Sequence, residues 1–307
     1  LFRSPESHEV GILSGNALKI TVDQKRHSTF YVWQVLWDLY TSNRIDILRT
    51  VGAQPAISMA NLKKFKIPLP PLPEQRAIAT ALSDVDALLD KLDALVAKKR
   101  DLKVAAMQQL FTGQTRLPGF SGEWEVKRLG DVLRFQVGFP FGSEFFNQEV
   151  DGVRLVKNRD LKADDQIFYY SGKFDDAFIV RNGDVLIGMD GDFLPCLWSK
   201  GAALLNQRVG RVVASPKISA LFSYYMLAEP LKAIEHATSA TTVKHLSHGD
   251  VEGIERALPA IEEQSAIATV LSDMDAELTA LEARRDKTRA LKQGMMQELL
   301  TGRIRLV

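Results

Sequence analysis

The chain contains one segment of about 40 residues twice, and this repeat restricts the possible folds more than any other feature. Pro73 to Gly113 recurs 189 positions later as Glu262 to Gly302, without a gap. The matched stretches include Leu82-Ser83-Asp84 with Leu271-Ser272-Asp273, and Met107-Gln108 with Met296-Gln297. A repeat at one fixed offset predicts two copies of one structural unit.

Each copy is expected to form one long helix. Prolines crowd the start of the first copy, where proline is tolerated. Gly113 and Gly302 follow the two predicted ends, where a left-handed glycine readily terminates a helix. At a rise of 1.5 Å per residue, about 40 residues span roughly 60 Å.

Apolar residues recur at heptad spacing in both copies, which is typical of a coiled-coil seam. The simplest partner for one helix is the other, because the two share their length and register, so an antiparallel pair is expected. The alternative is two unrelated surface helices. The predicted seam residues are Ile78, Leu82, Val85, Leu89 and Leu92 in the first copy and Ile267, Leu271, Met274, Leu278 and Leu281 in the second.

Composition adds several limits. The 307 residues suffice for two or three domains, and the content of 46% hydrophobic and 25% charged residues is ordinary for a globular protein. The single cysteine, Cys196, excludes an intramolecular disulfide and a cysteine-cluster metal site, and it fits a reducing compartment. The sequence contains no run of 18 apolar residues, so no membrane span is predicted. The net charge of +1 gives no general support to nucleic-acid binding, so any such surface must be local.

The elements before each long helix repeat as well. A helix predicted at 28–43, with Ser28 as its N-cap, corresponds to one at 219–228, and a polar loop at 50–58 corresponds to 239–247. An extended segment, 61–72, corresponds to 250–261. Between the long helices, Val153 to Val156, Phe178 to Val180 and Asp184 to Met189 are predicted strands.

We therefore predict an α+β fold in which mainly β domains with a helix are joined by two long antiparallel coiled-coil helices. The expected domains are the C-terminal part of a first β-rich domain, a long helix, a complete second β-rich domain and a second long helix, at residues 1–67, 68–113, 114–260 and 261–307.

Motifs for catalysis are missing from the sequence. It contains no GxxxxGK[ST] phosphate-binding loop, and neither Asn-Pro-Pro-Phe/Tyr nor Asp-Pro-Pro-Tyr, the tetrapeptides expected of an amino-methyltransferase, occurs. His245 and His248 are better explained as polar loop residues than as metal ligands. Asp190 and Asp192 flank Gly191, and a turn is favoured there over a Mg²⁺ site. We predict neither catalytic nor metal-binding residues.

Two groups of motifs resemble type I restriction–modification specificity (S) subunits. Pro68 to Ala79 (PLPPLPEQRAIA), the long helix and Met107 to Gly113 (MQQLFTG) resemble the conserved region of that family. Val185 to Gly191 (VLIGMDG) and Asn206 to Val209 (NQRV) are similar to its target-recognition-domain pattern. The resemblance covers nearly the whole chain in the order recognition domain, helix, recognition domain, helix.

This resemblance implies a non-catalytic subunit of the prokaryotic cytoplasm that reads a bipartite site in double-stranded DNA. It also implies that the helices act as a ruler between half-sites and dock two methyltransferase (M) subunits, with restriction/motor (R) subunits joining them. No cofactor is expected in this chain, because S-adenosylmethionine, ATP and Mg²⁺ belong to the partner subunits. The first recognition domain is represented only by its last 66 or so residues. We therefore expect an N-terminally truncated form, or a domain that another chain completes.

Polar loops are the expected DNA contacts, because side chains on loops or helices reach the base edges. Gln suits adenine and Arg suits guanine as two-point partners. The alternatives are a structural ion pair, a solvated charge or a linker. The candidates are Lys157, Asn158 and Arg159; Gln207 and Arg208; Thr241, Thr242, Lys244 and His245; and, in the first domain, Thr50, Gln54 and Ser58.

Two further classes of function remain open at this stage. A coiled-coil scaffold without a DNA role is compatible with the weak net charge. A nuclease or a methyltransferase is disfavoured by the missing motifs.

Overall fold

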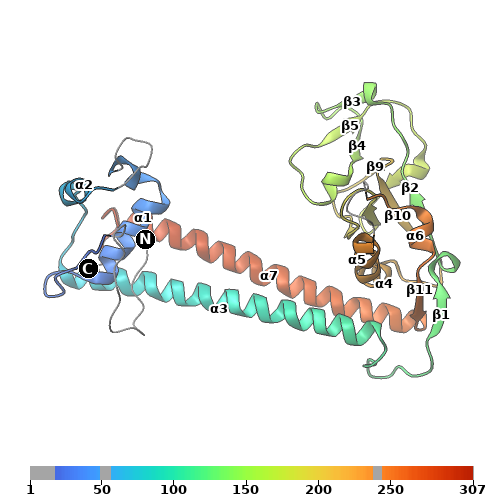
Figure 1. Ribbon diagram of the computed structural model, residues 1–307, viewed down its shortest axis with the longest axis horizontal. Coiled ribbons are helices and arrows are strands. Elements are labelled where there is room, and N and C mark those ends of the chain that lie inside the picture. The colour runs from blue at the N-terminus through green and yellow to red at the C-terminus, as the bar shows by residue number, and fades with distance from the viewer. Residues whose placement is uncertain (1–17, 49–56, 238–243, 307) are drawn as a thin grey trace. The chain divides into compact units, whose positions relative to one another are not determined.

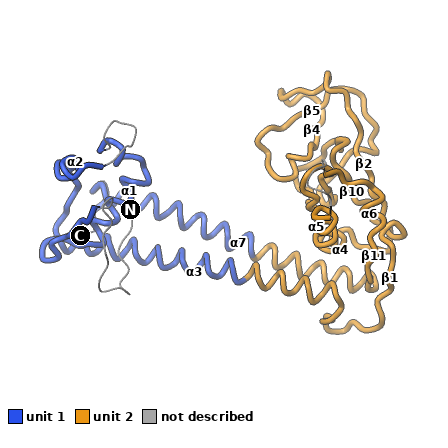
Figure 2. Tube along the Cα trace, viewed as in Figure 1, with its two compact units in different colours: residues 1–98, 278–307 blue, residues 99–277 orange. Residues whose placement is uncertain are grey.

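The computed structural model describes residues 18–48, 57–237 and 244–306. It contains two compact units (Figure 2): unit 1 comprises residues 1–98 and 278–307, and unit 2 comprises residues 99–277. Figure 1 shows the long helices α3 (Leu72–Phe111) and α7 (Ile261–Leu299), and Figure 2 shows that each contributes to both units. Among the described residues, no helix combines the length and the apolar character needed to cross a membrane.

Unit 1 is helical where it is described. Besides its parts of α3 and α7 it contains α1 (Thr29–Thr41), the 3₁₀ helix η1 (Arg44–Leu48) and α2 (Met59–Lys64). The predicted helix at 28–43 is confirmed, and the Ser28 hydroxyl accepts the Tyr31 N–H at 3.3 Å. Its core joins α1 to both long helices through Tyr31, Ile78 and Leu299.

The expectation of an extended segment at 61–72 is wrong for its first residues. Ser58 caps α2 by accepting the Asn61 N–H at 3.1 Å. Leu62 and Phe65 pack against the unit 1 core. Tertiary packing and an N-cap therefore stabilise a helix of six residues whose intrinsic tendency to form is weak.

The long helices pair antiparallel in unit 1. Lys292 Nζ lies 2.5 Å from Asp86 Oδ1, and Arg285 Nη1 lies 3.7 Å from Asp93 Oδ1. As the residue number rises along α3, the number of its partner on α7 falls, which is the signature of antiparallel pairing.

The same pairing holds the long helices together in unit 2. Lys103 Nζ lies 2.5 Å from Asp275 Oδ1, and Lys99 Nζ lies 2.7 Å from Glu277 Oε1. The Lys103–Asp275 pair is the Asp86–Lys292 pair of unit 1 with both residues moved by 189 positions.

All ten residues predicted for the seam are buried or half-buried, as packed helices require. The predicted helix ends are confirmed. Gly113 and Gly302 adopt φ of 69° and 76°, the left-handed conformation that glycine allows.

Unit 2 contains a four-stranded antiparallel sheet. Its strand order is β2-β10-β7-β8, and helix α4 packs against β7, β8 and β10. Its core includes Leu129, Phe135, Ile187 and Phe222. The strands are Leu133–Val137, Val209–Ala214, Val185–Gly188 and Pro195–Leu197 for β2, β10, β7 and β8. Helices α4, α5 and α6 span Ala220–Met226, Ala228–Ala237 and His248–Glu252.

Unit 2 also contains a five-stranded sheet of order β3-β5-β4-β9-β6. Strands β4 and β9 are parallel, with Leu155 opposite Leu204. A two-stranded ribbon of β1 (Glu125–Arg128) and β11 (Glu255–Leu258) leads into α7. The strands β3, β4, β5, β6 and β9 are Phe146–Asn147, Val153–Val156, Phe168–Tyr170, Ile179–Val180 and Ala203–Leu205. The 3₁₀ helices η2 to η5 are Leu129–Asp131, Ser143–Phe145, Asn158–Leu161 and Asp176–Phe178.

The predicted fold class, α+β with a mainly β domain and two long helices, is confirmed. The strand predicted at 153–156 is present as β4, and the one predicted at 184–189 is present as β7. The segment 178–180 begins as the last residue of η5 and continues as β6.

A buried glutamine near the start of each long helix makes the same contacts in both units. In unit 1, Gln75 accepts the Ser28 N–H at 2.9 Å and donates to the Pro70 carbonyl at 2.7 Å. In unit 2, Gln264 accepts the Ser219 N–H at 3.0 Å and donates to the Pro259 carbonyl at 2.9 Å. Each glutamine ties its long helix to the preceding loop and to the N-cap of α1 or α4.

Candidate nucleic-acid interface

Three segments meet at one end of the four-stranded sheet. Strands β7 and β10 are antiparallel, with Gly188 opposite Val209, so the end of β7 lies beside the start of β10. The Met189 N–H donates to the Arg208 carbonyl at 3.0 Å. A third segment joins them, because the Leu246 N–H donates to the Met189 carbonyl at 2.8 Å. The polar residues that follow or precede these strands are therefore brought together.

Asp190 is the centre of this group. Its carboxylate accepts a hydrogen bond from Arg208 Nη1, and His245 Nδ1 lies 2.9 Å from its other oxygen. Its main-chain carbonyl accepts the Asn158 side-chain amide at 2.6 Å. We call Asn158, Asp190, Arg208 and His245 the Asp190 cluster.

Close packing fixes the amide of the Asp190 cluster. A Cβ atom at Gly188 would lie 1.9 Å from Asn158 Oδ1, far inside van der Waals contact. Glycine at the end of β7 is therefore the residue that lets Asn158 reach the turn after this strand.

The charges of the cluster are unequally exposed. The Asp190 side chain is 19% exposed, whereas those of Arg208 and His245 are 65% and 58% exposed. Burial would raise the pKa of the Asp190 carboxyl, but hydrogen bonds from His245 and Arg208, and their charges, hold that pKa below its ordinary value. A charged carboxylate thus holds two exposed donors at the surface of unit 2.

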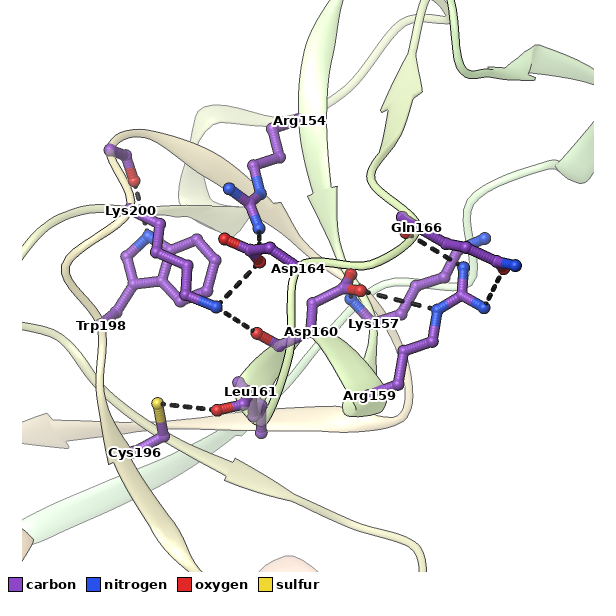
Figure 3. A network of polar contacts seen from close by, with 11 residues as sticks. Arg154, Lys157, Arg159, Asp160, Leu161, Asp164, Gln166, Cys196, Trp198 and Lys200 are labelled. Carbon is purple, nitrogen blue, oxygen red and sulfur yellow. Dashed lines mark hydrogen bonds and ion pairs between the residues drawn. The ribbon is translucent and has the colours of Figure 1, made fainter. Parts of the chain in front are cut away.

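Lys157 and Arg159, on either side of Asn158, make different contacts (Figure 3). The Lys157 ammonium lies 3.3 Å from the centroid of the Phe168 ring, and burial lowers its pKa. Arg159 donates to Gln166 Oε1 at 2.6 Å. Asp160 follows Arg159 in the chain; its buried carboxylate accepts the Lys157 N–H at 2.8 Å, and burial raises the pKa of this carboxyl. These contacts fold the η4 segment onto the five-stranded sheet.

The rest of the network in Figure 3 secures the same segment from the other side. Asp164 accepts hydrogen bonds from Arg154 at 2.5 Å and from Lys200 at 2.8 Å. Lys200 also donates to the Asp160 carbonyl at 2.7 Å. These contacts hold in place the segment from which Asn158 reaches the Asp190 carbonyl.

Comparison with known proteins supports an assignment to a family. The family model "Type I restriction modification DNA specificity domain" matches residues 12–97 and 121–289, which is more than half of the chain. The chain belongs to the type I restriction–modification specificity-domain family. The resemblance of the helix and recognition motifs to S subunits is thereby confirmed.

Individual members of the specificity family match different lengths. The EcoBI specificity subunit of Escherichia coli is 34% identical over 186 residues, which are 59% of this chain and 39% of that subunit. The putative MjaX specificity subunit of Methanocaldococcus jannaschii is 27% identical over 313 residues, 95% of this chain and 72% of the relative. The chain thus spans well under half of the first relative. An S subunit structure from M. genitalium shares the fold, with a TM-score of 0.60, 16% identity, and coverage of 88% of this chain and 72% of that one.

The structure places the other candidates of this specificity-family member as follows. Gln207 is exposed beside Arg208, and its N–H donates to the Phe139 carbonyl at 3.1 Å. Lys244 Nζ lies 3.5 Å from Glu235 Oε1, and Ser58 caps α2. Thr50, Gln54, Thr241 and Thr242 lie outside the described residues.

Asp190 is the member of the cluster that the sequence did not single out as a candidate DNA contact. The motif VLIGMDG marks a turn after an apolar strand, and nothing in it names the partners of the aspartate. Asp192, two residues on, pairs with Lys162 instead. Across residues 18–48, 57–237 and 244–306, no three His, Cys, Asp or Glu side chains are grouped in a way that could hold a metal ion.

Proposed function

We propose that this specificity-family chain is the DNA-recognition subunit of a type I restriction–modification complex, and that unit 2 reads one half of a bipartite target. The observation that carries the proposal is the Asp190 cluster. Asn158, Arg208 and His245 were selected from separate segments, and one aspartate gathers all three. The exposed guanidinium of Arg208 and imidazole of His245 are donors of the kind that read base edges and bind phosphates, and the half-buried Asn158 amide secures the turn that holds them.

We further propose that α3 and α7 set the distance between the two half-sites. They contain 40 and 39 residues without a break. Gln75 and Gln264 make matching contacts at their two starts, which favours an equivalent recognition domain before each helix. The first of these domains would read the other half-site.

The same helices are the proposed docking surface for two M subunits, to which R subunits are recruited. Leu88, Leu95 and Leu102 repeat every seven residues along α3 and are 38%, 39% and 46% exposed. Apolar side chains left outside the seam suit a protein partner. In this proposal the chain itself is non-catalytic and cytoplasmic, and S-adenosylmethionine, ATP and Mg²⁺ are bound by the partners.

The test is methylation sequencing of the genome of cells that express this chain with its cognate M subunit. A second culture expresses a form in which a complete recognition domain precedes residue 1. The proposal predicts a methylated motif with two specified half-sites in the second culture. A palindromic motif with the chain as given would mean that two copies each supply unit 2. Methylation of no defined motif in either culture would contradict the proposal and favour a scaffold without a DNA role.

A further inference from the structure

One edge of the Arg208 guanidinium is held and the other is open. Nη1 donates to Asp190, whereas the described part of the chain offers no hydrogen-bond partner to Nε or Nη2. The side chain is 65% exposed. The N–H groups of Nε and Nη2 are parallel, so the open edge is a two-point donor that faces solvent.

The chain itself shows what such an edge binds. Arg116 places Nε and Nη2 on the two carboxylate oxygens of Glu263, each at 2.5 Å. Arg305 does the same with Glu74. Each ligand presents two acceptor atoms side by side. In DNA, that pattern belongs to O6 and N7 of guanine in the major groove and to the oxygens of a phosphate.

The charge next to Arg208 favours guanine over phosphate. The Asp190 carboxylate is in contact with the guanidinium and remains ionised, so the pair carries little net charge. A phosphate on the open edge would approach a carboxylate of its own sign, whereas the guanine edge is neutral and interacts through its two acceptors.

Rigidity is the second requirement for reading a base, and Asp190 meets it. Its backbone is held by Asn158 at the carbonyl and by the Lys244 carbonyl, which accepts the Gly191 N–H at 3.3 Å. Its second carboxylate oxygen contacts His245. The Asp190 carboxylate is therefore held in place, and it fixes the position of the Arg208 guanidinium.

We propose that Arg208 reads a guanine of the half-site through Nε and Nη2, and that Asp190 is the positioning residue that holds it by Nη1. This inference rests on the proposed function of unit 2. It adds the identity of one base, guanine, and separate roles for Arg208, which contacts the base, and Asp190, which positions Arg208.

The test uses the complex of the chain with its M subunits and duplexes in which each guanine of the half-site is replaced in turn by 7-deazaguanine. That base keeps O6 and lacks the N7 acceptor. We expect one position at which the replacement weakens binding by the wild-type complex, on the order of 10-fold. With Arg208→Lys, which keeps the positive charge and loses the planar two-point edge, the same replacement should have a clearly smaller effect.

The positioning role has its own readout. Asp190→Asn should reduce discrimination at that guanine and leave the affinity for unrelated DNA unchanged or higher, because a negative charge is removed from the interface. Asp192→Asn is the matched control. It removes the same charge only two residues from Asp190, but Asp192 pairs with Lys162 and not with Arg208. It should keep full discrimination. Thermal melting of each variant separates loss of fold from loss of reading.

The outcomes that overturn the inference are distinct. Insensitivity to 7-deazaguanine at every position, with Arg208→Lys and wild type behaving alike on all DNA, would make Arg208 a phosphate contact. Full discrimination by Asp190→Asn would remove the positioning role. A wild-type complex that prefers no sequence at all would instead refute the proposed function, and the inference with it.

Discussion

Asp190 illustrates what residue-level reasoning could and could not find. The segments around Asn158, Arg208 and His245 were selectable because amides, guanidinium groups and imidazoles are typical of loops that contact DNA. Their meeting point was not, because these residues lie 32, 18 and 55 positions from Asp190. The sequence also could not separate Asn158 from its neighbours Lys157 and Arg159, which turn to the ring of Phe168 and to Gln166.

The contact between Gly188 and Asn158 yields a prediction about stability. Gly188→Ala places a methyl group 1.9 Å from Asn158 Oδ1, so the amide must leave the Asp190 carbonyl. We expect a loss of about 2 kcal/mol in the free energy of unfolding, as for other overpacked sites. In an Asn158→Ala background the same substitution should cost less than about 0.5 kcal/mol, because the clash is gone. Urea unfolding of the wild type, the two single variants and the double variant measures the coupling; equal costs in both backgrounds would disprove the contact.

A second residue-level prediction concerns the ion pair of Arg116 with Glu263, whose side chain is 2% exposed. Arg116→Ala leaves a buried carboxylate without its partner and should destabilise unit 2 more than the loss of a surface ion pair does. Arg256→Ala breaks a pair in which both partners are well exposed, with Glu229, and should change stability by less than about 1 kcal/mol. Chemical denaturation of both variants gives the comparison. Similar small losses would show that the Arg116 pair contributes no more than a surface contact.

At the scale of elements, the long helices were predictable and the sheets were not. Local sequence signals predict helix α3: the prolines before it, the heptad spacing of its apolar residues and Gly113 after it. Strand pairing depends on contacts between distant segments, such as parallel β4 and β9, and short strands of two to six residues carry little periodicity. Helix α2 was missed for a related reason, since packing of Leu62 stabilises a segment that is too short to signal a helix.

The proposed spacing role of the helices predicts a defined response to lengthening. Insertion of one heptad into α3 and one into α7, at facing positions of the seam, keeps the seam in register. Seven residues add about 10 Å of rise, which corresponds to about 3 base pairs of DNA at 3.4 Å each. Methylation sequencing should then return the original half-sites with a gap longer by about that number. An unchanged gap, with methylation intact, would mean that the helices do not measure it.

At the scale of the whole molecule, the net charge of +1 limits what the chain can do on DNA by itself. Phosphate neutralisation supplies most non-specific affinity and makes it sensitive to salt. We therefore expect weak binding by the isolated chain, with a shallow dependence on salt concentration. The complex with M subunits should bind more tightly and with a steeper slope. Fluorescence anisotropy at several salt concentrations tests this; equal slopes would indicate that the chain alone makes all phosphate contacts.

The matched glutamines at the starts of α3 and α7 have a consequence for how such a chain can change. Gln75 and Gln264 each bind two main-chain groups, an N–H at a helix start and a proline carbonyl, and Gln75 Nε2 also lies 3.3 Å from His27 Nδ1. None of these partners is among the proposed DNA contacts. A recognition domain that ends in the same short helix and proline loop would fit either glutamine, so such domains would be interchangeable. Exchange of such modules could alter the target while the framework that receives them stays untouched.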